Sequence, residues 1–152
     1  MTGDLRAANA YYEQALAAAG RNVRSNPNAI TLANLGGVSL EQGDYAAASG
    51  YYRESLAIVA ELENRLWAAI ALDGLAAVAL DAGDGEKAAM LAGAAEALSE
   101  VAASPLEEWE QSLRDRYVAE LRSTLDAMTL ERQWARGRAL TLREAAEAAL
   151  GE

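Results

Sequence analysis

Hydrophobic residues recur along most of the chain at intervals of three and four, the spacing of one face of an α-helix. The clearest stripe follows residues 43–44 and consists of Tyr45, Ala48, Tyr52, Leu56 and Val59. No stretch alternates between apolar and polar positions with the period of two that marks a half-buried strand. The pattern therefore predicts an all-α protein of about seven helices.

The helical pattern also repeats, with a period of 40 residues set by Gly-Asp pairs at 3–4, 43–44 and 83–84. Upstream of the second and third pairs, ANLGGVSLEQGD aligns with DGLAAVALDAGD. Each glycine can end one helix, and each aspartate can cap the next one. We therefore expect helical hairpins over residues 1–103, the first of them only half present.

A different pattern begins at Ser104. The segment Ser104-Pro105-Leu106-Glu107 has the form of a capping box, which predicts that a long helix begins there. A second capping box, Thr141 to Glu144, precedes a final alanine-rich helix. Because a repeat array needs an atypical unit to cover its last apolar face, we expect residues 104–152 to cap the repeats within the same compact domain.

The repeats share four features: Asn-Leu-Gly at 34–36, the Gly-Asp turn, a small residue at 48 and an aromatic residue at 52. In these features they resemble the tetratricopeptide repeat (TPR), which implies a right-handed α-α superhelix, or solenoid. Here the period exceeds the usual one of about 34 residues. Two further segments are MLAGAAEALSEVAASP, at residues 90–105, and WARGRALTLREAAEAAL, at residues 134–150. With them, roughly residues 43–150 resemble the C-terminal helical-repeat region of LuxR-type and STAND-class bacterial transcriptional regulators. That resemblance implies an interaction scaffold or regulatory segment of a larger signalling protein.

Composition excludes several kinds of chemistry. The chain has no cysteine and no histidine, so disulfides, thiol nucleophiles, Cys/His zinc sites and histidine catalysis are absent. Its formal net charge of −10 disfavours direct binding to nucleic acid or to anionic membranes. No GxxxxGK[ST] phosphate loop and no apolar run of membrane-spanning length occurs. We therefore expect a cytoplasmic protein with no cofactor, no metal and no catalytic residues.

The candidate binding surface is the concave face that the TPR pattern assigns to the first helix of each hairpin. Its acidic residues suit a basic or amphipathic helix from a protein partner, although they are equally consistent with an ordinary solvated surface. Capture of an acidic C-terminal peptide is disfavoured, since this face has no lysine or arginine. The face consists of Ile30, Ala33, Asn34, Gly37, Glu41, Ile70, Asp73, Ala77 and Asp81.

Two functions are consistent with these features. The first is a non-enzymatic protein-interaction scaffold, and the alternative is a small-molecule effector sensor that holds its ligand inside the superhelix. A pocket closed by the C-terminal helices around Trp109 or Trp134 favours the sensor, whereas an open acidic groove favours the scaffold. The helix over residues 4–20 lacks its hairpin partner. We therefore expect this chain to belong to a longer one and, in isolation, to form a two-fold dimer through that helix.

Overall fold

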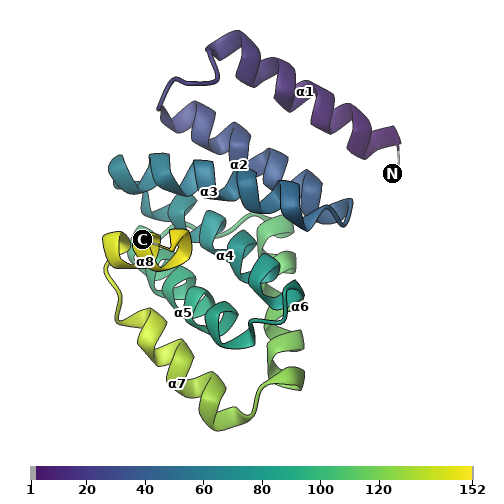
Figure 1. The fold of residues 1–152 in the computed structure, drawn as a ribbon. Helices are drawn as coiled ribbons and strands as arrows, with labels where there is room; N and C mark the ends of the chain where they lie inside the picture. Colours follow the sequence, from purple (N-terminus) through teal and green to yellow (C-terminus); the bar gives the residue numbers. More distant parts are fainter. Residues whose placement is uncertain (1–2, 152) are drawn as a thin grey trace.

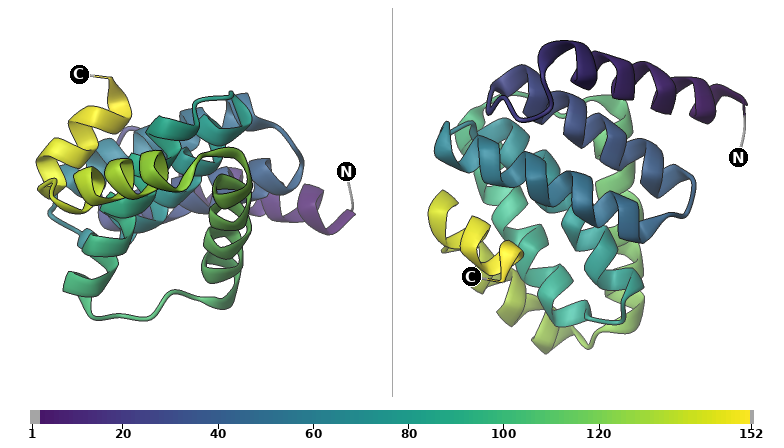
Figure 2. Two further views of the ribbon diagram at one scale, coloured as in Figure 1. Left: turned by 90° about the horizontal axis from the view of Figure 1, so that it is seen from below. Right: turned by 45° about the horizontal axis from the view of Figure 1, so that its top comes forward.

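The computed structural model describes residues 3–151, which form eight α-helices and no strand (Figure 1). Helices α1 to α5 stack side by side in chain order and alternate in direction, so they form a helical-repeat solenoid (Figures 1 and 2). The all-α repeat fold is thus confirmed, with one helix more than expected. The helices are α1 (Gly3–Ala19), α2 (Asn26–Glu41), α3 (Tyr45–Glu61), α4 (Arg65–Asp81), α5 (Gly85–Ala102), α6 (Glu108–Thr124), α7 (Ala127–Arg138) and α8 (Leu142–Leu150).

The Gly-Asp pairs at 43–44 and 83–84 form the turns within the hairpins, as the repeat pattern predicted, whereas the pair at 3–4 is the start of α1. Gly43 and Gly83 have φ angles of 76° and 84°, in the left-handed region that glycine adopts without steric cost. The aspartate that follows each glycine is an N-cap: Asp44 accepts a hydrogen bond from the Ala47 amide, and Asp84 accepts one from the Lys87 amide, both at 3.1 Å. Local sequence therefore determines where α3 and α5 begin.

The largest fully buried side chain in the repeats is Tyr52 of α3, which is 1% exposed. Its ring occupies space that two glycines leave free on the neighbouring helices. A Cβ atom on Gly36 of α2 would lie 2.7 Å from the ring, and one on Gly74 of α4 would lie 2.3 Å from it. The ring thus connects α2, α3 and α4, and both glycines are needed to admit it.

The predicted capping box at Ser104 is wrong. Ala103, with a φ of 55°, ends α5, and α6 begins only at Glu108, whose N-cap Glu107 forms no side-chain capping bond. Ser104 Oγ donates instead to the Ala102 carbonyl oxygen at 3.5 Å, so its side chain faces the end of α5 and does not cap α6. By contrast, the second capping box is confirmed. The Glu144 amide donates to Thr141 Oγ1 at 3.1 Å, and the Thr141 amide donates to Glu144 Oε1 at 2.9 Å.

The last three helices all pack against the repeats, as Figure 2 shows from two sides. α7 lies so close to α5 that a Cβ on Gly93 would be 2.1 Å from the Trp134 carbonyl oxygen. A Cβ on Gly137 would be 1.9 Å from the Met90 carbonyl oxygen, so both positions require glycine. α8 contacts α3, where Arg53 donates to the Leu150 carbonyl at 2.7 Å. None of the helices in residues 3–151 has both the length and the apolar character needed to cross a bilayer.

Candidate functional site

Helix α6 covers part of the face that α2 and α4 were expected to offer to a partner. It packs against α4 and α5, and its apolar stripe is buried there. Three residues of that stripe, Leu113, Tyr117 and Leu121, are each at most 7% exposed. The chain therefore places an amphipathic helix of its own on its groove.

A buried ion pair joins α6 to α4. Asp73 is 1% exposed, and Arg114 forks onto it: Nε lies 3.1 Å from both carboxylate oxygens, and Nη2 lies 2.7 Å from Oδ2. The Tyr117 hydroxyl donates a short hydrogen bond to Oδ1, and Arg114 Nη2 also donates to Ser99 Oγ at 2.9 Å. Both oxygens of Asp73 are thus engaged by α6, and Asp73 faces this helix instead of an open groove.

Burial and charge fix the protonation of the two donors. Burial and the nearby Asp73 carboxylate raise the pKa of the Tyr117 hydroxyl well above its usual value. For Arg114, burial alone would lower the pKa, but the attraction of Asp73 outweighs it and raises that pKa. Burial raises the pKa of the Asp73 carboxyl, against the opposing effect of the Arg114 guanidinium. Both donors therefore keep their protons at neutral pH.

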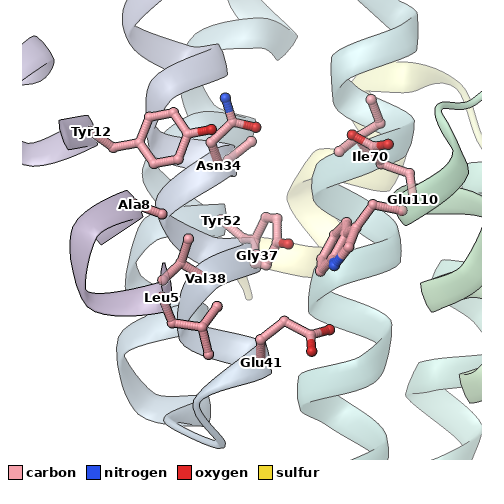
Figure 3. A pocket seen from close by; sticks show the side chains of 12 residues that line it. Leu5, Ala8, Tyr12, Asn34, Gly37, Val38, Glu41, Tyr52, Ile70 and Glu110 are labelled. Atoms are coloured by element: carbon pink, nitrogen blue, oxygen red, sulfur yellow. The ribbon is translucent and has the colours of Figure 1, made fainter. Parts of the chain in front are cut away.

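The remainder of the groove forms a pocket of about 250 Å³ between α1, α2, α4 and α6 (Figure 3). Five of the predicted groove residues line it: Ala33, Asn34, Gly37, Glu41 and Ile70. Sequence reasoning did not assign its other walls, which come mainly from α1 and α6, with one residue each from α2 and α3. They are Leu5, Ala8, Tyr12, Val38, Tyr52, Trp109 and Glu110. We refer to this cavity as the α6 pocket.

The other predicted groove residues lie outside the α6 pocket. Asp73 lies beneath α6, Ile30 and Ala77 are half-buried on α2 and α4, and Asp81 is exposed at the last position of α4. The structure therefore brings four of the five predicted α2 residues together with Ile70, and separates them from Ile30 and from the rest of the α4 half.

Two acidic residues of the α6 pocket have different surroundings. Glu41 lies at its rim, where its Oε1 accepts a hydrogen bond from Arg116 of α6 at 3.0 Å. Glu110, by contrast, has a buried oxygen, Oε2, without any hydrogen-bond partner. An apolar surface is provided by Trp109, whose ring would lie 3.0 Å from a Cβ on Gly37. The pocket can therefore offer a partner both apolar contact and an unpaired carboxylate oxygen.

A second cavity, of about 610 Å³, lies between α5, α6 and α7. Its walls include Val118, Arg122, Leu125, Leu130, Glu131 and Trp134. The Trp134 indole donates to Glu96 Oε1 at 3.2 Å, and Arg138 pairs with the same carboxylate. We refer to this space as the Trp134 cavity. Within residues 3–151, no cluster of three or more acidic side chains is placed to hold a metal ion.

Stacked hairpins with a lined groove define a helical-repeat binding fold. Residues 28–100, from α2 into α5, match the model of the tetratricopeptide repeat family. No curated protein and no solved structure was found to match the chain. TPR domains generally mediate interactions between proteins.

Proposed function

We propose that this chain is a non-enzymatic interaction scaffold and that a segment of a partner protein binds at the α6 pocket. The observation that carries the proposal is the pocket itself, where four helices surround apolar walls and the two carboxylates of Glu41 and Glu110. Its volume of about 250 Å³ is below the roughly 300–1,000 Å³ of pockets that enclose drug-sized ligands. The pocket suits one or two side chains inserted from a larger partner, with a basic or amphipathic segment favoured by charge.

The wider role that we propose is regulatory. The resemblance of residues 43–150 to LuxR-type and STAND-class transcriptional regulators supports a place in a larger cytoplasmic regulator, in which this segment binds no cofactor. The formal net charge of −10 supports binding to protein instead of nucleic acid or membrane. An ATPase or DNA-binding domain in the reading frame that flanks this segment is the expected observation, and flanking frames that encode neither contradict it.

Selection from a displayed peptide library tests the binding site. The wild-type chain should enrich related segments, and the same segments should not bind Asn34→Trp, because the larger ring occupies the pocket. Ala46→Trp, an exposed position on α3 outside the pocket, is the matched control and should bind like wild type. Failure to enrich any segment, or equal binding by Asn34→Trp, contradicts the proposal.

The Trp134 cavity supports a second function, the binding of a small effector molecule. Its volume of about 610 Å³ lies within the roughly 300–1,000 Å³ that is typical of ligand pockets, and its walls are mainly apolar. A panel of small apolar acids and amides, screened by ligand-observed NMR, should yield binders that compete for one site. Ala135→Leu, which narrows the cavity, should abolish that binding; binding that survives it contradicts this function.

Self-association is a further part of the proposal. α1 packs against α2, while Tyr11 on its outer side remains 67% exposed, which supports a two-fold homodimer through residues 4–20. Sedimentation equilibrium should report a dimer for the wild type and a monomer for Tyr11→Glu. A wild-type chain that stays monomeric at high concentration contradicts the dimer.

A further inference from the structure

Glu110 of the α6 pocket is a carboxylate that no lysine or arginine of residues 3–151 pairs with. Its Oε2 is buried and accepts no hydrogen bond, and none of the ion pairs among residues 3–151 includes it. Arg114, four residues later on α6, has the spacing of a helical ion-pair partner but forks onto Asp73 instead. A carboxylate withdrawn from water is costly unless a donor or a cation reaches it.

The other charges around the pocket are already balanced. Asp73 is paired with Arg114 beneath α6, and Glu41 is paired with Arg116 at the rim. Of these three carboxylates, Glu110, in the first turn of α6, is therefore the one without an ion-pair partner, and its field adds to burial in raising the pKa values of Asp73 and Tyr52. A ligand that completes this site brings a single positive charge.

The shape and lining of the pocket favour a planar cation. Asn34 of α2 and Glu110 of α6 lie on opposite sides of the pocket, as Figure 3 shows, so a ligand between them has acceptors on two sides. The Trp109 side chain lines the same space. A guanidinium has donors in a rigid fork, is weakly hydrated and packs well on aromatic rings, whereas an ammonium is compact and strongly hydrated.

We infer that the α6 pocket is a subsite for the guanidinium group of an arginine in a partner protein segment, held by Glu110 and Asn34 beside Trp109. This inference rests on the proposed interaction function and adds the chemistry that the partner must present. The chain already uses the same chemistry nearby, where the Arg114 guanidinium binds the groove carboxylate Asp73.

The test uses the full chain and N-acetyl-arginine methylamide as the probe, with the citrulline analogue as its neutral isostere and the lysine analogue as the compact cation. Binding is followed through the tryptophan indole resonances, with that of Trp109 assigned by Trp109→Phe. We expect a saturable shift of the Trp109 resonance with the arginine probe and a much smaller one with the other two. Equal responses to arginine and citrulline overturn the inference.

Glu110→Gln should weaken binding of the arginine probe by about tenfold, the scale of losing one charge-assisted contact in a partly buried site. Glu108→Gln is the matched control, because it makes the same charge change at an exposed position on the same helix and should leave binding unchanged. Equal weakening by both variants indicates a non-specific effect of net charge and overturns the inference.

The peptide selection separates this inference from the proposed function. Enriched segments should share an arginine whose replacement by citrulline abolishes binding to the wild-type chain. Segments that bind the pocket without any such arginine overturn the inference and leave the proposed function intact. Binding of the probe when no peptide segment is enriched contradicts the proposed function and, with it, the assignment of the arginine to a protein partner.

Discussion

Two carboxylates on the same face of the solenoid, Asp73 and Glu110, have opposite surroundings. Asp73 is 1% exposed and is engaged by Arg114 and Tyr117, so its carboxylate is paired within the chain at the contact between α4 and α6. Glu110 has a buried oxygen that no donor reaches. The comparison teaches that an acidic groove residue can hold a helix of its own chain or be available to a partner, and that its neighbours in space decide between the two roles.

The largest loss of stability is expected when the ion pair between Asp73 and Arg114 is broken. Arg114→Met leaves Asp73 buried without its cation, and we expect the free energy of unfolding to fall by about 3–5 kcal/mol. Urea denaturation followed by circular dichroism measures the loss. Adding Asp73→Asn to this variant should recover part of it, because the buried charge is then removed.

Arg116→Met is the control for that experiment. Its ion pair with Glu41 is largely exposed, with 59% of the Arg116 side chain accessible, so its removal should cost less than about 1 kcal/mol. Equal losses for Arg114→Met and Arg116→Met would show that breaking the buried ion pair costs no more stability than breaking the exposed one.

A smaller loss of stability is expected when the space beside the buried Tyr52 ring is filled. In Gly74→Ala the new Cβ would lie 2.3 Å from that ring, and the overpacking should cost about 1–3 kcal/mol. Gly50→Ala is the matched control: Gly50 is exposed within α3, and nothing lies within 4 Å of a Cβ built there. That variant should instead gain about 0.5–1 kcal/mol from helix propensity. If both variants are destabilised, contact with the Tyr52 ring is not the cause of the loss in Gly74→Ala.

The smallest change in stability is expected at Glu110, the carboxylate without an ion-pair partner. Glu110→Gln removes a charge that has no partner, so the free energy of unfolding should stay constant or rise by up to about 1 kcal/mol. Thermal denaturation of this variant beside Arg114→Met measures the contrast between the two carboxylates. A loss as large as that of Arg114→Met would mean that the chain itself already neutralises Glu110.

Local features of this protein could be predicted from the sequence because they depend on residues within one or two helical turns. The apolar spacing predicted the helices, Gly43 and Gly83 predicted the turns, and Thr141 with Glu144 predicted the last capping box. Where a single local signal was ambiguous, prediction failed. Ser104 matched the capping pattern, yet Ala103 is left-handed, the Ser104 hydroxyl bonds back to the Ala102 carbonyl, and α6 begins only at Glu108.

The candidate site was only partly predictable. The repeat pattern identified Asn34, Gly37 and Glu41 as residues of a common face, and these three do line the α6 pocket. It could not show that Trp109 and Glu110 complete that pocket, because the helical spacing of α6 says which of its residues are apolar and not where the helix lies.

Only the tertiary structure decided how the acidic face is used. Asp73 and Arg114 are 41 residues apart in the chain, and their contact exists because the stacking of α4 and α5 leaves a groove into which α6 packs. In the position that buries its apolar stripe there, α6 also places Arg114 on Asp73 and leaves Glu110 beside the open pocket. The sequence determined the helices and the charges. Their packing, which depends on many weak contacts between distant residues, determined which charge is paired within the chain.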